Sequence, residues 1–66
     1  MRNRIAEARR KAGMTQQELA KAAGVSRTTI WALEKNIATT VLSSTILSIA
    51  RVLNTTVDDL FFEEKV

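Results

Sequence analysis

Apolar residues recur every three or four positions along most of this chain, which is the period of helices that bury one face. The first segment has only a thin apolar stripe, formed by Ile5, Ala8 and Ala12. The full pattern predicts helices over about 3–12, 16–23, 27–35 and 57–61. It also predicts a fourth helix, which starts between residues 41 and 45 and is closed by Asn54. No repeat or linker divides them, so residues 1–66 are expected to form one compact all-α domain of five helices.

Capping signals divide the stretch 15–36 into two short helices. Thr15 and Glu18 have the T-x-x-E spacing of a capping box, which starts a helix. Gly24 can end that helix in the left-handed conformation at no steric cost, and Ser26 can cap the next helix at once. A helix, a glycine turn and a second helix is the helix-turn-helix pattern, whose second helix can enter the major groove of DNA.

The other helix ends are predicted from single residues. Gly13 stops the first helix, and Asn36 ends the third because Asn tolerates the left-handed conformation. Thr56 caps the short fifth helix. The fourth helix has several possible N-caps, namely Thr39, Thr40, Ser43 and Ser44.

Composition excludes several classes of protein. The chain has 66 residues, of which 45% are hydrophobic, as in a small globular domain near the lower size limit for folding alone. It has no cysteine and no histidine, so we expect no disulfide, no metal site and no cofactor. No apolar run approaches the roughly 20 residues of a membrane span, and the N-terminus lacks a signal-peptide core. The expected location is cytoplasmic.

Positive charge is concentrated in the half of the chain that holds the helix-turn-helix pattern. Residues 1–36 carry a net charge of +5, whereas residues 37–66 carry −2. A surface that binds a polyanion requires such an excess, although ordinary solvation of helix surfaces by Lys and Arg would account for it equally well. The charge therefore supports the DNA-binding hypothesis without deciding it.

Residues suited to catalysis are scarce. The chain has no His, Cys or Tyr to act as a nucleophile or base near neutral pH, and no glycine-rich phosphate loop. The acidic pairs 58–59 and 63–64 could be imagined as a carboxylate site. A favourable charge in the first turn of a helix and a solvated tail explain them better. We therefore expect no enzyme activity.

Candidate DNA contacts lie on the outward face of the third helix and at the start of the second. Arg27 could pair bidentately with guanine, or it could be a phosphate contact or a solvated residue. Gln16 could bind a phosphate beside the helix N-terminus, or it could be a plain surface amide. The whole candidate set is Thr15, Gln16, Ser26, Arg27, Thr28, Thr29, Trp31, Ala32, Lys35 and Asn36.

Within this set the expected roles differ. Thr28 can bond to a base or a phosphate, Thr29 more readily to a phosphate, and Ala32 can touch a thymine methyl group. Lys35 and Asn36 could meet the DNA backbone or simply end the helix. Trp31 points away from the inner stripe, so it could pack on sugars or thymine methyl groups, or cover the loop that follows the helix.

The stretch 15–36 resembles the helix-turn-helix of the XRE family, the Cro and CI-like phage and bacterial repressors. The matching residues are Gln16, Ala20, Gly24, Val25, Ser26, Ile30 and Glu34, with Arg9 upstream and Leu53, Asp59, Leu60 and Phe61 downstream. The resemblance implies a five-helix domain of the lambda-repressor type, a phosphate contact by Gln16, and DNA facing the outward positions of 26–32. It also implies a structural ion pair between Arg9 and Glu34.

Three departures from the family pattern concern the packing and the base contacts. Ala8 stands where a larger aliphatic residue is usual, which suggests loose packing of the first helix. Asn36 and residues 37–41 replace a loop that commonly carries Gly and Pro. Trp31 and Ala32 supply no obvious hydrogen-bond code, so the operator sequence does not follow from them.

These observations predict a sequence-specific DNA-binding transcriptional regulator, a repressor that binds a palindromic operator as a homodimer. A dimer would span half-sites about 34–36 Å apart and double the contacts with DNA. Leftover apolar residues predict its interface: Ile37, Val41, Leu42, Phe61, Phe62 and Val66. The two phenylalanines could instead close the monomer core. The alternatives are an antitoxin or adaptor whose main partner is a protein, and a non-specific nucleic-acid coating protein.

Overall fold

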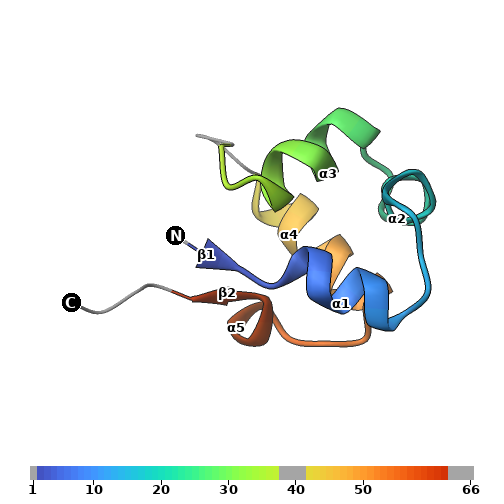
Figure 1. Cartoon of the computed structure of the whole chain (residues 1–66). Coiled ribbons are helices and arrows are strands. Elements are labelled where there is room, and N and C mark those ends of the chain that lie inside the picture. Colours follow the sequence, from blue (N-terminus) through green and yellow to red (C-terminus); the bar gives the residue numbers. More distant parts are fainter. Residues whose placement is uncertain (1, 38–41, 63–66) are drawn as a thin grey trace.

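The computed structural model describes residues 2–37 and 42–62, with only the backbone described for Arg2 and Phe62. Within these two ranges the chain forms five helices and one pair of very short strands, arranged as in Figure 1. They are β1 (Arg2–Asn3), α1 (Ile5–Lys11), α2 (Gln16–Ala23), α3 (Arg27–Glu34), α4 (Ser43–Val52), α5 (Val57–Leu60) and β2 (Phe61–Phe62). The predicted all-helical fold with five helices is confirmed.

The helix-turn-helix forms as its capping residues predict. The Glu18 N–H donates to Thr15 Oγ1 at 3.0 Å, and the Thr15 N–H donates to Glu18 Oε1 at 2.8 Å, which completes the capping box. Gly24 has a φ of 74° and closes α2 in the left-handed conformation. Ser26 Oγ accepts the Thr29 N–H at 3.1 Å at the start of α3. These local bonds set the turn between the two helices.

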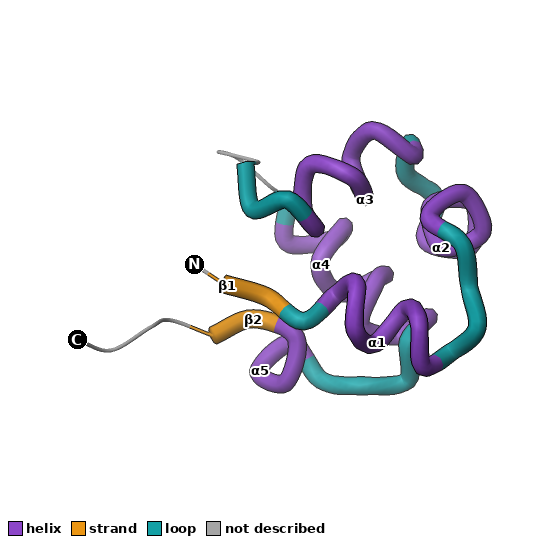
Figure 2. Tube along the Cα trace, in the orientation of Figure 1, coloured by secondary structure: helices purple, strands orange, loops and turns teal. Residues whose placement is uncertain are grey.

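The core lies where α2, α3 and α4 meet, with one buried side chain from α1 and one from α5 added to it. The helices that contribute to it are drawn in purple in Figure 2. Its buried members are Ile5, Leu19, Ala20, Ile30, Leu33, Ile49, Ala50 and Leu60. Ala20 lies between larger neighbours, and its small side chain suits the close approach of α2 to its neighbours. Ala12, predicted to face inward, is instead exposed at the C-terminal end of α1.

The two strands are a feature that the periodicity missed. Asn3 pairs with Phe61 in the antiparallel pair β1–β2, and the Arg4 N–H donates to the Leu60 carbonyl at 2.7 Å. The Asn3 amide accepts the Ile5 N–H through Oδ1 and donates through Nδ2 to the Leu33 carbonyl at 2.7 Å. The predicted helix start at residue 3 and the predicted end of the fifth helix at residue 61 are therefore wrong. Extended pairing between the two ends of the chain replaces helix at both positions.

The beginning of α4 lies inside the predicted range, but its cap differs. Leu42 holds the N-cap position in extended conformation and makes no side-chain capping bond. Ser43 and Ser44 are the first helical residues, and the predicted caps at 39 and 40 lie outside the described residues.

Three other predicted helix boundaries are confirmed by the backbone. Asn36 and Asn54 both have positive φ, of 60° and 55°, and follow the ends of α3 and α4. Thr56 Oγ1 accepts the Asp59 N–H at 3.1 Å and caps α5.

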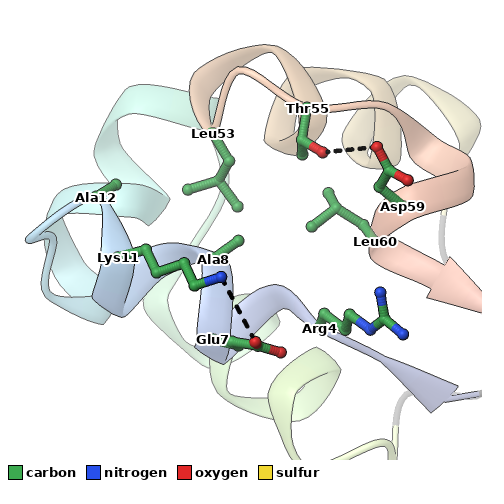
Figure 3. Close-up of a pocket in the computed structure, with 9 residues that line it drawn as sticks. All are labelled: Arg4, Glu7, Ala8, Lys11, Ala12, Leu53, Thr55, Asp59 and Leu60. Atoms are coloured by element: carbon green, nitrogen blue, oxygen red, sulfur yellow. Dashed lines mark hydrogen bonds and ion pairs between the residues drawn. The ribbon is translucent and has the colours of Figure 1, made fainter.

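A surface hollow of about 440 Å³ separates part of α1 from α5 and the turn before it (Figure 3). Ala8, Leu53 and Leu60 lie along its apolar floor. Charged side chains stand at its rim, where Lys11 Nζ lies 3.8 Å from Glu7 Oε1. The short side chain of Ala8 leaves this space beside α1, which agrees with the loose packing expected there.

Ala8→Leu is expected to raise the free energy of unfolding by about 0.5–2 kcal/mol, because the longer side chain covers Leu53 and Leu60. Urea unfolding followed by circular dichroism measures the change. Ala22→Leu is the matched control, since Ala22 is exposed on α2 and should gain little. A stability loss in Ala8→Leu would mean that the hollow does not accommodate the added carbons.

Candidate nucleic-acid interface

An ion pair between α1 and α3 underlies the candidate surface. Arg9 Nε lies 2.7 Å from Glu34 Oε2, and Arg9 Nη2 donates to Glu34 Oε1 at 3.2 Å, a bidentate arrangement. The third nitrogen, Nη1, donates to the Met14 carbonyl at 2.8 Å. The Arg9 and Glu34 side chains are only 12% and 6% exposed. The pair that the family resemblance implied is therefore present, and it also fastens the turn before α2.

Gln16 belongs to the same network. Its Nε2 donates to Glu34 Oε1 at 3.0 Å, so the side chain connects the first residue of α2 to the last residue of α3. Gln16 is half-buried and is therefore not a plain surface amide. An amide nitrogen carries two hydrogens, and only one is used by this bond. Residue spacing gave no signal for the Gln16–Glu34 contact, because it depends on how the helices cross.

The network holds its charges at neutral pH. Burial by itself raises the pKa of Glu34, but hydrogen bonds from Arg9 and Gln16 and the charges of Arg9 and Arg10 outweigh it. The pKa of Glu34 therefore lies below its ordinary value of 4.5. The hydrogen bond and charge of Glu34 raise the pKa of Arg9, despite the opposing effect of burial. Both partners are charged throughout the physiological range.

Two surface hollows flank the N-terminal end of α3. The larger, of about 510 Å³, is lined by Arg9, Gly13, Met14, Thr15, Gln16, Gln17 and Arg27. It brings the start of α2 together with Arg27, the first residue of α3. Both groups favour the binding of an anion. A helix N-terminus has unpaired N–H groups and a positive potential, and the arginine side chain carries a positive charge.

The second hollow, of about 240 Å³, is lined by Arg27, Thr28 and Trp31. The Trp31 side chain is 44% exposed, although it is flanked in sequence by the fully buried Ile30. Arg27 lines both hollows and therefore lies between them.

Some of the remaining candidates are hydrogen-bonded or half-buried within the protein, and the others are exposed. Ser26 and Thr29 bond to each other through their hydroxyl groups at 2.9 Å as part of the helix cap. Ala32 is half-buried. Lys35 and Asn36 are exposed at the C-terminal end of α3, about 12 Å along the helix from Arg27. The structure thus gathers Thr15, Gln16, Arg27, Thr28 and Trp31 around the two hollows and leaves Lys35 and Asn36 at the far end.

The predicted dimer residues do not form one described cluster. Ile37 and Leu42 are 56% and 70% exposed, whereas Phe61 is half-buried and packs against the core. Val41, Val66 and the Phe62 side chain lie outside the described residues. Leu47 is 49% exposed on α4 and was not predicted, although the stripe of Ile46, Ile49, Ala50 and Leu53 places it on the outer face.

Comparison with known proteins identifies the family. A helix-turn-helix family model matches residues 5–60, which include all five helices. The chain belongs to the XRE-type helix-turn-helix family. An uncharacterized HTH-type transcriptional regulator of Archaeoglobus fulgidus is 52% identical over 61 residues, which cover 92% of this chain and 86% of that protein. The family consists of DNA-binding regulators rather than enzymes.

Solved structures of SinR, a protein of Bacillus subtilis, have the same fold. SinR in complex with DNA is 30% identical, with a TM-score of 0.76, and the match covers 82% of this chain and 86% of that one. A complex of SinR with SinI matches with a TM-score of 0.77 at 30% identity, over 82% of this chain. There the match spans only 52% of the matched chain. In the parts of our chain that the structure describes, no helix is long and apolar enough to cross a membrane.

Glu34→Gln is expected to lower the free energy of unfolding at pH 7 by about 1–3 kcal/mol, because Arg9 loses its charged partner in a mostly buried place. The pKa of Glu34 is lower when folded, so its contribution is complete above the ordinary value of 4.5. That contribution is lost as the pH falls through the folded pKa, and the two proteins should therefore converge in stability below pH 4.5.

Urea unfolding of both proteins across this pH range makes the measurement. Glu7→Gln is the control, because Glu7 is exposed and pairs with Lys11 only at 3.8 Å. A Glu34→Gln variant whose deficit is independent of pH would contradict the electrostatic explanation. A variant with unchanged stability but altered DNA choice would show that Glu34 acts in recognition rather than in folding.

Proposed function

We propose that this DNA-binding regulator is a repressor that recognises a palindromic operator as a homodimer, with the N-terminal half of α3 in the major groove. The observation that carries the proposal is the position of Arg27 between two hollows, one bordered by the start of α2 and one by Trp31. Such a surface offers anion-binding groups beside base-reading groups, as a groove-binding helix requires.

Phosphate binding is assigned to the hollow at the start of α2. The first N–H groups of a helix have no partner inside it; the Glu18 N–H is taken by Thr15 Oγ1, which leaves those of Gln16 and Gln17 beside this hollow. The second amide hydrogen of Gln16 is directed by a side chain that Glu34 already holds in place. Thr15 and Gln17 border the same hollow and add polar groups. These contacts fix the position of the domain on DNA without reading its sequence.

Base reading is assigned to the outer side of α3. Arg27 matches guanine O6 and N7 bidentately, and Thr28 and Trp31 lie beside it along the helix. Ser26, Thr29 and Ala32 border this surface; the hydroxyl groups of Ser26 and Thr29 bond to each other in the cap, and Ala32 is half-buried. Lys35 and Asn36 approach the DNA backbone at the far end of α3. A dimer occupying an operator in this way represses by excluding other proteins from the same DNA.

Dimerisation is supported by two exposed apolar side chains near the loop between α3 and α4. Ile37 and Leu42 stand on either side of that loop, and both are more than half exposed. A second copy covering them would remove this apolar surface from water. Val41, Phe62 and Val66 remain in the proposed interface, whereas Phe61 is removed from it because it packs on the core.

A protein partner is the second candidate, and the SinR–SinI complex favours it. Under this alternative the same domain acts as an adaptor or antitoxin, with DNA binding secondary. Its mark would be a stable complex with another protein that forms without DNA.

Competition binding on a site selected from random DNA tests the main proposal. The protein should prefer its own site to random DNA by at least roughly a thousandfold. Arg27→Ala should cost about 1–3 kcal/mol and relax the preference at one position of each half-site. Arg51→Ala, which removes the same charge from an exposed place on α4, should leave the preference unchanged.

Two results would count against this assignment. Equal affinity for the selected and random DNA would replace the repressor with a non-specific coating protein. An unchanged site preference in Arg27→Ala would reduce that residue to a phosphate contact.

Equilibrium sedimentation tests the dimer. The wild-type protein is expected to associate at micromolar concentration, and Leu42→Glu should return it to a monomer because a charge would enter the apolar contact. Leu47→Glu is the matched control, an exposed leucine of α4 outside the proposed interface. A wild-type monomer at high micromolar concentration would contradict dimerisation, and dissociation by Leu47→Glu alone would move the interface along α4.

A further inference from the structure

Trp31 is a large apolar side chain in an unusual place, since it lies on the face of α3 that is assigned to bases. It is 44% exposed, and Arg27 lies one helical turn before it, with Thr28 three residues before it. The three side chains line one hollow of about 240 Å³, here called the Arg27–Trp31 notch. The notch is smaller than the usual site for a free small molecule, about 300 Å³ or more. It suits a small group that projects from a larger partner.

The walls of the notch favour an apolar group. The indole ring is apolar over most of its surface, and a guanidinium is weakly hydrated on its two faces. Thr28 contributes a methyl group and a hydroxyl group between them. A cationic group would lose water here without gaining a carboxylate partner, and the anionic phosphates are assigned to the hollow at the start of α2. A methyl group loses nothing and covers part of the exposed indole.

Double-stranded DNA presents one kind of apolar group in its major groove, the C5-methyl group of a pyrimidine. Thymine carries it in ordinary DNA, and 5-methylcytosine carries the same group in modified DNA. When Arg27 pairs bidentately with guanine, its guanidinium plane lies level with that base. The neighbouring base is about 3.4 Å away along the strand, which matches van der Waals contact with a planar guanidinium.

We infer that the Arg27–Trp31 notch reads a 5′-TG-3′ step: Arg27 bonds to the guanine, and the thymine methyl group lies between its guanidinium and the Trp31 indole. The inference rests on the proposed function, because it requires α3 in the major groove. It assigns Trp31 a role in specificity although that residue offers no hydrogen-bond code. Pyrimidine–purine steps such as TG also unstack easily, which eases the entry of a bulky ring beside them.

The test removes one methyl group from DNA. After a site has been selected from random DNA, the thymine before the Arg27-dependent guanine is replaced by deoxyuridine. Binding should weaken about fourfold, the effect expected from burying one methyl group. In Trp31→Ala the ratio should fall to about twofold or less, because only the Arg27 guanidinium still contacts the methyl group, while the preference for guanine persists. Leu47→Ala, a loss of exposed apolar surface on α4, should keep the fourfold ratio.

A second arm separates the methyl group from the rest of thymine. Cytosine and 5-methylcytosine are compared at the same position, and 5-methylcytosine should bind more tightly in the wild type, with a smaller advantage in Trp31→Ala. Trp31 is the only tryptophan in the chain, so its fluorescence reports on the notch directly. The emission should change more on binding the thymine site than on binding the deoxyuridine site. Trp31→Phe retains an aromatic wall and should keep part of the ratio.

The outcomes separate this inference from the proposed function. A selected site without a TG step, or equal binding of the thymine and deoxyuridine sites, would contradict the inference that the notch reads this step. Specific recognition of DNA would still stand. A methyl effect of undiminished size in Trp31→Ala would assign the methyl contact to another residue. Failure to select any preferred site would overturn the proposed function itself.

Discussion

The carboxylate of Glu34 is the group on which the arrangement of this small protein depends. One of its oxygens accepts from Arg9, and the other accepts from both Arg9 and Gln16. Through these bonds the end of α3 is joined to α1, to the start of α2 and, by way of Arg9, to the Met14 carbonyl. A shielded ion pair is not necessarily a large source of net stability, because desolvation offsets much of its attraction. What this network provides is a defined position for α3, because it fastens the last residue of that helix to α1 and to the start of α2.

That position matters because α3 has two different faces. Ile30 is completely buried, and the next residue, Trp31, is nearly half exposed. The inner face packs in the core, and the outer face is the one proposed to contact DNA, so a rotation of the helix would bury one set of side chains and expose the other. Gln16 has a role in the fold and a second role in the proposed DNA contact. Its bond to Glu34 serves the fold, and its remaining amide hydrogen serves the proposed phosphate contact.

Specificity in such a domain depends on few residues. The fold is shared with proteins that recognise different partners, so it indicates DNA binding but not the sequence that is bound. Here the outer end of α3 combines an arginine, a threonine and a tryptophan around one notch. In the proposed binding mode this combination reads a methyl group as well as hydrogen bonds, and Trp31 distinguishes it from a purely polar surface.

The amino-acid sequence by itself determined the helix-turn-helix, because its signals are local. The capping box at Thr15, the left-handed Gly24 and the cap at Ser26 each act within four residues, and α2 and α3 begin where they predict. The resemblance to a family, rather than spacing, supplied the Arg9–Glu34 pair.

Only the tertiary structure decided the features that join distant segments. Asn3 pairs with Phe61 at the other end of the chain, which shortens two predicted helices, and Gln16 meets Glu34 because α2 and α3 cross there. Arg27, Thr28 and Trp31 form a notch only because their side chains point the same way on the folded helix, and this was seen only in the structure. Helix ends follow from neighbouring residues, whereas strand pairing and side-chain networks depend on chain closure, which no local pattern encodes.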